Sequence, residues 1–395
     1  MKSHQQRHLA DLSRQQRFRL EGLRATLDES SGELVDTVML RMFDIEHALL
    51  ADLDTRSPRR RLTRRLAELT QARIGHLRHH GPIPVLLPAS YWDAEPPEPA
   101  PPIAIVTPSY GQGEFIERTI CSVTRQRYPA LEYVVQDGGS RDQTVSVLRH
   151  HADELTHWSS ARDGGHADAL NRGFARTSAP IMAYLNSDDL LLPGSLAYVA
   201  RYFEAHPNAD AVYGHRLLIN ESDQLLGRWV MPPHDDEAMT LVDYIPQETL
   251  FWRRRIWDAT GGYFDTSLNM AIDWDLLLRF HAAGARIVRL PRFLGAFRVH
   301  DAQKTQRDQA LNDIDCERLR IRAHGREVPL AEAIERTKPY LRRQVRAHLA
   351  YRAGELLRGR TRSRPLEIAA PVPLDAHARE STAASPRSVR SGSQA

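Results

Sequence analysis

Between residues 103 and 300, short apolar runs alternate with amphipathic stretches along the chain. Apolar runs bounded by turn residues are typical of buried strands, and apolar residues at helical spacing are typical of helices. The pattern predicts strands at residues 103–107, 133–136, 155–158, 181–185 and 211–213, followed by short strands past Leu217. It predicts helices at residues 115–123, 167–176, 193–205 and 274–283, with one more that begins near Ser140. This alternation predicts an α/β fold with a mostly parallel sheet, because parallel strands need crossover connections.

The residues before this α/β region have a different composition. Residues 1–81 are rich in arginine and carry apolar residues at helical spacing, so an N-terminal helical region is predicted there. Proline is frequent in residues 82–102, and because it removes backbone donors and stiffens the chain, the segment is predicted to be an extended linker. Tyr91 and Trp92 within it are expected to dock on the next domain.

The C-terminal part also divides in two. After a central domain at residues 103–305, residues 306–365 are predicted to form arginine-rich C-terminal helices. Residues 366–395 contain mainly Ala, Ser, Pro and Arg, with few large apolar side chains. A segment of that composition cannot bury enough apolar surface to fold, so a disordered tail is predicted.

Composition and charge narrow the class of protein. The chain has 395 residues, a net charge of +3 and two cysteines, Cys121 and Cys316, which are too few for a disulfide framework. It shows no apolar leader and no apolar run of transmembrane length. A cytoplasmic protein is therefore predicted. The arginine-rich face of residues 1–81 is compatible with peripheral contact to the inner face of the membrane, and an ordinary solvated helix face is the alternative.

Polar clusters rich in carboxylates follow the predicted strands, where ligands bind in α/β sheets. The five clusters are Thr107-Pro108-Ser109-Tyr110, Asp137-Gly138-Gly139-Ser140-Arg141-Asp142, Arg162-Asp163-Gly164-Gly165-His166 with Asp168 to Gly173, Asn186-Ser187-Asp188-Asp189, and Asp273-Trp274-Asp275. Hard oxygen ligands such as those of the fourth cluster suit a divalent cation that is bound to substrate phosphates. A solvated loop, in which Asp189 fixes a turn, is the alternative for that cluster alone.

The order and spacing of these clusters resemble those of the family 2 glycosyltransferases, which are inverting nucleotide-sugar enzymes of the GT-A fold. The resemblance covers residues 103–305 and is carried by Asp137-Gly138-Gly139-Ser140 and by Leu185-Asn186-Ser187-Asp188-Asp189. The chain is similar in particular to bacterial members of the family that act in surface-polysaccharide assembly. It implies transfer of a sugar from a nucleotide sugar, with a UDP-sugar expected, to a hydroxyl group of a glycan or lipid-linked glycan.

The resemblance assigns the nucleotide-sugar side of the site to residues after the first strands. They are Pro108, Tyr110, Asp137, Asp163, Asp168, Arg172 and Asn186. It implies that Pro108 and Tyr110 lie beside the nucleobase and ribose, and that Asp137 accepts a hydrogen bond from the base. Asp163 and Asp168 would line the nucleotide and sugar, and Arg172 would reach a phosphate.

The resemblance also implies a metal site for Mg or Mn. The family motif is usually Asp-x-Asp, whereas Asn186 stands at its first position here and brings no charge. Asp188 is then the main protein ligand, and Asn186→Asp is expected to keep activity. His300 would ligate the metal or contact the diphosphate, and Lys304 would neutralise the diphosphate charge.

Inverting transfer also requires a carboxylate that takes the proton of the attacking hydroxyl group. Asp273, which precedes a late predicted helix, matches the family's base motif. Asp275, two residues later, is expected to cap or orient rather than to react. Gln247-Glu248-Thr249, ahead of Leu250-Phe251-Trp252, resembles the family's acceptor-side strand, with a plain strand start as the alternative.

The sequence leaves three other functions to be weighed. A sugar-nucleotide nucleotidyltransferase can share the α/β layout, but it needs a glycine-rich basic loop after the first strand, and Gly111-Gln112-Gly113-Glu114 is short and acidic. A nucleotide-sugar-binding module that has lost catalysis is favoured by Asn186 and disfavoured by Asp188 and Asp273. Nucleic-acid binding is disfavoured because the basic runs lack interleaved aromatic residues.

Overall fold

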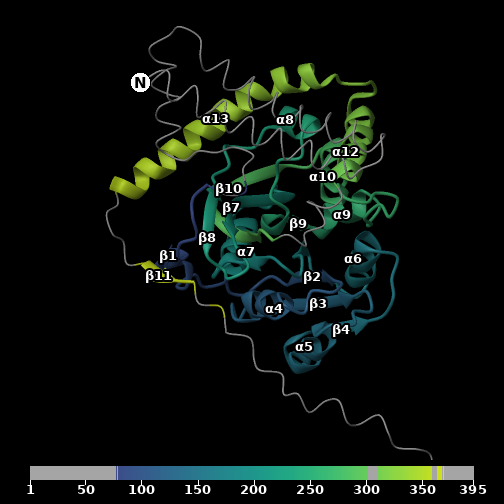
Figure 1. The fold of residues 1–395 in the computed structure, drawn as a ribbon, viewed down its shortest axis with the longest axis vertical. Helices are drawn as coiled ribbons and strands as arrows, with labels where there is room; N and C mark the ends of the chain where they lie inside the picture. The colour runs from purple at the N-terminus through teal and green to yellow at the C-terminus, as the bar shows by residue number, and fades with distance from the viewer. Residues whose placement is uncertain (1–76, 78, 301–308, 358–362, 367, 369–395) are drawn as a thin grey trace, which may run out of the picture.

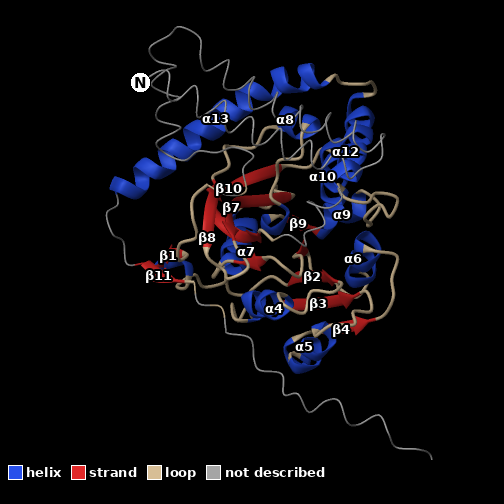
Figure 2. Cartoon of the chain, in the orientation of Figure 1, coloured by secondary structure: helices blue, strands red, loops and turns tan. Residues whose placement is uncertain are grey.

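The computed structural model describes residues 77, 79–300, 309–357, 363–366 and 368 of the chain. Lys304 and almost all of the predicted N-terminal helical region and of the predicted disordered tail lie outside the described residues. Figure 1 shows the order of the elements, and Figure 2 shows the strands at the centre with helices around them.

Within the described residues, a nine-stranded sheet has the strand order β4-β3-β2-β5-β9-β7-β10-β6, and β8 pairs with β7. Its strands are β2 (Ile103–Ser109), β3 (Leu131–Asp137), β4 (His157–Ser160), β5 (Ile181–Tyr184), β6 (Leu190–Leu191), β7 (Ala211–Ile219), β8 (Leu225–Trp229), β9 (Phe251–Arg253) and β10 (Ile287–Arg298). The pairings β2–β3, β2–β5, β3–β4 and β7–β10 are parallel, whereas the short β6, β8 and β9 pair antiparallel. The predicted α/β class with a mostly parallel sheet is confirmed.

Helices connect and cover these strands. They are α4 (Ile116–Thr124), α5 (Thr144–His150), α6 (His166–Phe174), α7 (Ser195–Ala205), α8 (Asp236–Leu241), α9 (Arg254–Ala259), α10 (Ile272–Ala282), α12 (Gln309–His324) and α13 (Leu330–Leu357). Single 3-10 turns form η1 (Ala89–Tyr91), η2 (Ala152–Glu154) and η3 (Gln247–Thr249). The predicted C-terminal helices are confirmed as α12 and α13. No helix among the described residues is both long enough and apolar enough to cross a bilayer.

Two local predictions are wrong. The helix expected near Ser140 begins at Thr144, because the Ser140 hydroxyl group donates to Asp137 Oδ1 (2.5 Å) instead of capping a helix. Past Leu217, where only short strands were expected, β10 has twelve residues and runs parallel to β7. Arginines and Pro291 obscure its apolar pattern, and the register with β7 shifts in that stretch.

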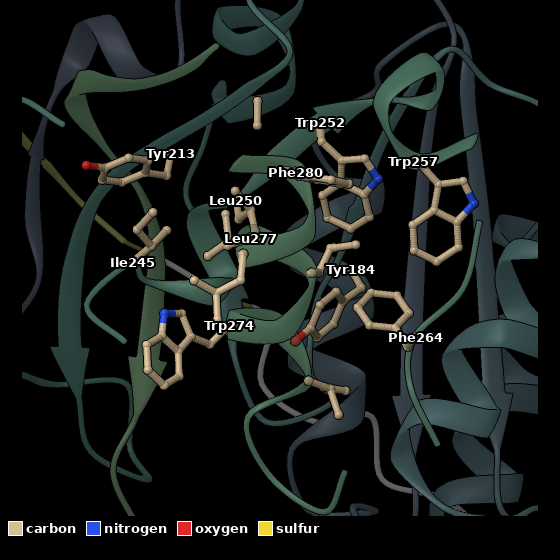
Figure 3. Packing of buried hydrophobic residues seen from close by; sticks show 14 of the residues in the cluster. Tyr184, Tyr213, Ile245, Leu250, Trp252, Trp257, Phe264, Trp274, Leu277 and Phe280 are labelled. Atoms are coloured by element: carbon tan, nitrogen blue, oxygen red, sulfur yellow. The ribbon is translucent and has the colours of Figure 1, made fainter. Parts of the chain in front are cut away.

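The core lies on both faces of the sheet because side chains alternate along each strand. In β2, Ile103 and Ile105 belong to one buried cluster, and Val106 belongs to the cluster on the other face. Figure 3 shows the second cluster, in which Tyr184, Trp252, Trp257, Phe264 and Phe280 pack as an aromatic group. Helix α6 lies close to β2, since a Cβ on Gly173 would come within 2.4 Å of Val106.

The proline-rich segment before β2 packs along the sheet. Its Val85 and Leu87 join a buried cluster with Leu217 and Phe293. Tyr91 is buried, and its hydroxyl group accepts a hydrogen bond from Phe293 N (3.2 Å). Within the same segment, β1 (Leu86–Pro88) pairs antiparallel with β11 (Ser363–Pro365). The expected docking of Tyr91 is therefore observed.

Candidate active site

The loop 186–189 follows β5 and is held from two sides. From α4, the Thr119 hydroxyl group lies within hydrogen-bond distance of the carbonyl oxygens of Ser187 (2.9 Å) and Asp189 (2.8 Å). From β10, Arg298 donates through Nε to Asp188 O (2.8 Å) and through its backbone N to Asp189 Oδ1 (3.0 Å). These contacts fix the direction in which each carboxylate of the loop points.

Asp188 and Asp189 have opposite environments although they are neighbours. Asp189 is 1% exposed, and burial, followed by the charges of Asp188 and Glu248, raises the pKa of its carboxyl group well above the ordinary value. Asp188 is only partly buried, and its Oδ2 lies 3.0 Å from Nε2 of the buried His300, whose ring packs on Phe115. Asp188 is therefore the loop carboxylate that is available to a ligand.

The pair of Asp188 and His300 offers one oxygen and one nitrogen ligand to a divalent cation. No group of three or more His, Cys, Asp or Glu side chains that could hold a metal ion occurs in the described part of the chain. A cation held by this pair would need its remaining ligands from substrate oxygens and water, which is the usual way in which Mg²⁺ is bound beside phosphates. The chemistry of the two side chains thus fits a metal that arrives with the substrate.

Asp137, predicted to contact the base, is fully buried at the end of β3. Its Oδ2 accepts hydrogen bonds from Gly139 N (3.1 Å), Ser140 N (2.9 Å) and the Ser160 hydroxyl group (2.6 Å). Gly139 has a φ of +86°, which favours glycine because it has no Cβ. In this structure the Asp137 carboxylate shapes the loop 138–140, and its contact with a base stays a prediction.

Tyr110 and Asp163 both lie next to Gly138, in the loop that follows β3. A Cβ on Gly138 would lie 3.1 Å from Asp163 Oδ2 and 3.3 Å from the Tyr110 ring, so only glycine fits between them without displacement. Tyr110 is 73% exposed, which leaves an aromatic face open to a planar ligand. Pro108 is buried at the end of β2, opposite Gln136.

A cavity of about 480 Å³ adjoins this aromatic face. It is lined by Tyr110, Gly111, Gln112, Gly113, Glu114, Phe115, Asp142 and Gln143. The loop between β2 and α4 thus contributes most of a concave surface next to Tyr110.

Asp163, Asp168 and Arg172 gather at the start of α6. Asp163 Oδ1 accepts a hydrogen bond from Gly165 N (2.9 Å), and Asp168 Oδ2 accepts one from Gly164 N (2.7 Å). Arg172 pairs with Asp168 across one turn of the helix (2.7 Å) and donates to the carbonyl oxygen of Arg162 (3.2 Å). Arg172 is thus already paired, and its expected contact with a phosphate stays a prediction.

Asp273 lies in the first turn of α10, so the expectation that this cluster follows a strand is wrong. Its Oδ1 accepts a hydrogen bond from Trp274 N (3.0 Å). Burial raises the pKa of its carboxyl group to about 6, and the charge of Glu248 adds to this effect while hydrogen bonds and the charge of Arg216 oppose it. A carboxylate with such a pKa is suited to accept a proton near neutral pH.

Asp275, in contrast to Asp273, is held in ion pairs within the protein. It is 1% exposed and pairs with Arg279 Nε (2.9 Å) and with Arg322 of α12 (2.5 Å). Two arginines therefore occupy both of its oxygens and tie α10 to α12. This arrangement agrees with an orienting role for Asp275.

Two features of the site were missed in the sequence. Arg216 of β7 donates to both oxygens of Glu248 (2.7 and 2.5 Å), and its guanidinium group lies over the rings of Trp229 and Phe297. Asp243 is solvent-exposed and lies close enough to Asp273 for the charges of the two carboxyl groups to interact. No spacing pattern signals either feature, because the partners come from different elements.

Comparisons with known proteins show similarity to glycosyltransferases. Residues 104–267 match the family described as Glycosyl transferase family 2. The chain is 28% identical over 186 residues to an uncharacterized glycosyltransferase of Mycobacterium tuberculosis H37Rv, covering 46% of this chain and 69% of that protein. It is 26% identical over 196 residues to a PGL/p-HBAD biosynthesis glycosyltransferase of Mycobacterium bovis BCG, covering 48% of this chain and 73% of that protein.

Among solved structures, the chain is similar to S. aureus TarS 1–349 in complex with UDP-GlcNAc, with a TM-score of 0.47 and 16% identity over 61% of this chain and 72% of that one. It spans 43% of a longer S. aureus TarS structure. It is also similar to the mannosyltransferase PcManGT from Pyrobaculum calidifontis in complex with GDP-Man and Mn²⁺, with a TM-score of 0.46 and 22% identity over 68% of this chain and 79% of that one. The family match makes residues 104–267 a domain of glycosyltransferase family 2, and the mycobacterial relatives named above are glycosyltransferases as well.

Proposed function

We propose that the enzyme transfers a sugar from a nucleotide sugar, with a UDP-sugar as the preferred donor, to a hydroxyl group of a glycan or lipid-linked glycan. Transfer would occur by a single displacement that inverts the anomeric carbon, in the assembly of a polysaccharide or glycolipid. The observation that carries the proposal concerns two parts of the site: the candidate base, Asp273, and the loop 186–189, which would face the diphosphate. The same charged side chains influence both. Burial raises the pKa of both Asp189 and Asp273, and the charges of the Arg216–Glu248 ion pair act on both carboxyl groups, so the strand-end loop and the candidate base share one electrostatic environment.

In this reaction Asp273 takes the proton of the acceptor hydroxyl group while that oxygen bonds to the anomeric carbon. The bond from the anomeric carbon to the diphosphate breaks in the same step, and a nucleoside diphosphate leaves. Asp188 and His300 would hold a divalent cation, which when bound offsets charge on the leaving diphosphate. Tyr110, the loop 138–140 and Asp163 would orient the nucleoside.

A catalytic role of Asp273 predicts how activity depends on pH. Its pKa of about 6 means that the reactive carboxylate is lost as the pH falls through that value. Turnover should therefore rise between about pH 5 and 7 and then level off. Asp243, Glu248, Arg216 and Tyr184 share its surroundings, so the rise can be less steep than that of one isolated group. Initial rates measured with saturating donor across this range test the prediction, and a flat profile would contradict it.

The proposed donor class is tested by release of nucleoside diphosphate from a panel of nucleotide sugars. We expect the purified full chain to release UDP from at least one UDP-sugar in a reaction that needs Mn²⁺ or Mg²⁺. If only GDP is released, the preferred donor is a GDP-sugar instead of a UDP-sugar, and the proposed reaction class is unchanged. Pyrophosphate release from a nucleoside triphosphate and a sugar phosphate would instead support a nucleotidyltransferase.

A further inference from the structure

The 3-10 turn η3 is made of three buried polar residues, of which the first contacts β5 and the other two contact β7. Gln247 contacts the end of β5, Glu248 pairs with Arg216 of β7, and Thr249 Oγ1 accepts a hydrogen bond from Gly214 N (3.1 Å). Strand β10 lies close to the turn, because a Cβ on Gly295 would come within 2.7 Å of Glu248. The position of Gln247 is therefore fixed by its own contact and by those of the two residues that follow it.

The orientation of the Gln247 amide is fixed as well. Its Nε2 donates to the carbonyl oxygen of Tyr184 (2.7 Å). A carbonyl oxygen can only accept, so the nitrogen of Gln247 must face Tyr184 and its Oε1 must face the other way. Gln247 is buried, and an unpaired Oε1 would be costly.

Asn186 satisfies that oxygen. Asn186 Nδ2 donates to Gln247 Oε1 (3.1 Å), and it also lies 3.4 Å from Asp189 Oδ2. A side-chain amide has two N–H groups, and here the two face two acceptors. Asn186 Oδ1 makes no hydrogen bond within the described residues and is not sealed from solvent. It is the polar atom of this side chain that remains for a ligand.

We propose that Gln247 is a positioning residue that requires an amide at position 186 and turns Asn186 Oδ1 toward the donor diphosphate and its cation. The inference rests on the proposed donor site at Asp188. It explains the departure from Asp-x-Asp by a contact between residues 61 positions apart in the chain. We infer that the first position of the motif is neutral because two acceptors already face it, Gln247 Oε1 from η3 and Asp189 Oδ2 from the same loop.

The consequence is the opposite of the expectation drawn from the motif. In the Asn186→Asp variant, a carboxylate would face Gln247 Oε1, which can only accept, so this contact would have no proton, and a second acidic group would lie beside Asp189. Rotation of the Gln247 amide cannot relieve this, because its Oε1 would then face the Tyr184 carbonyl oxygen. Restoring the usual motif should therefore weaken the site.

The test is calorimetric titration of the full chain with UDP, and separately with GDP, in the presence of Mn²⁺. We expect Asn186→Asp to bind the nucleotide at least ~10-fold more weakly than the parent, as expected for leaving a buried polar group unpaired, and no more tightly than Asn186→Ala. Gln247→Glu should also bind more weakly, because its second oxygen faces the Tyr184 carbonyl oxygen. Asn208→Asp, the same change on an exposed turn, is the matched control and should bind like the parent.

A double variant separates positioning from general damage to the fold. In Asn186→Asp with Gln247→Lys, the ammonium group can donate to Tyr184 O and to the new carboxylate, so affinity should recover relative to Asn186→Asp alone. Binding by Asn186→Asp that equals or exceeds that of the parent overturns the inference, and so does unchanged binding by Gln247→Glu.

If the parent binds neither nucleotide, the donor proposal fails and thermal unfolding decides the inference. A lower Tm for Asn186→Asp but not for Asn208→Asp then supports it, and equal Tm values overturn it.

Discussion

Replacing Asp273 by asparagine should lower the rate of sugar transfer by ~10²–10⁴-fold, the effect typical of removing a general base. The substitution keeps the shape of the side chain and removes a carboxylate whose pKa is raised to about 6. The affinity for the donor should stay within a few-fold of the parent, because the base acts on the acceptor hydroxyl group. Turnover and calorimetric donor binding, measured on the same preparation, separate the two effects.

Asp153→Asn is a matched control for this change, since Asp153 is exposed on η2 and is not part of the site. It should leave both turnover and affinity unchanged. Near-normal turnover of Asp273→Asn would remove Asp273 as the base. Asp275 would then be a poor substitute, because Arg279 and Arg322 occupy both of its carboxylate oxygens. Attention would move to Asp243, an exposed carboxylate whose charge interacts with that of Asp273.

Asp188→Ala should abolish measurable transfer and weaken cation-dependent binding of the nucleoside diphosphate. Even outer-shell partners of a metal typically contribute ~10–100-fold to its affinity, so loss of a direct ligand should cost at least that much. His300 would remain alone, without the carboxylate that lies 3.0 Å from its Nε2. Titration with UDP and with GDP, each with Mn²⁺ and with chelator, measures the effect.

The comparison with chelator makes this prediction specific. In the parent, removal of the cation should reduce affinity strongly, whereas in Asp188→Ala the two titrations should converge. Full activity of Asp188→Ala with chelator present would exclude a metal role for this residue. A loss of affinity that is equally large with and without Mn²⁺ would instead assign Asp188 to direct contact with the donor.

The alternation of strands and helices and the place of the polar clusters follow from local patterns in the chain. Apolar runs such as residues 103–107 and 181–185 are local signals, and β2 and β5 lie where those runs predict. Because β2, β3, β4 and β5 are parallel, their carboxyl ends share one edge of the sheet, which brings Tyr110, Asp163 and Asp188 to the same side. The periodicity of apolar residues and the order of the predicted elements were sufficient to predict this part of the structure.

What each polar side chain of the site can do depends on contacts between residues that are far apart in the chain. Asp188 and Asp189 are equivalent in the sequence, yet contacts from Arg298, more than a hundred residues away, bury one and leave the other available. The raised pKa of Asp273 depends on burial and on charges from β7 and η3, and the orientation of Asn186 depends on Gln247. Burial, charge and hydrogen-bond pairing are set by neighbours in space, and no local pattern in the chain encodes which distant residue becomes that neighbour.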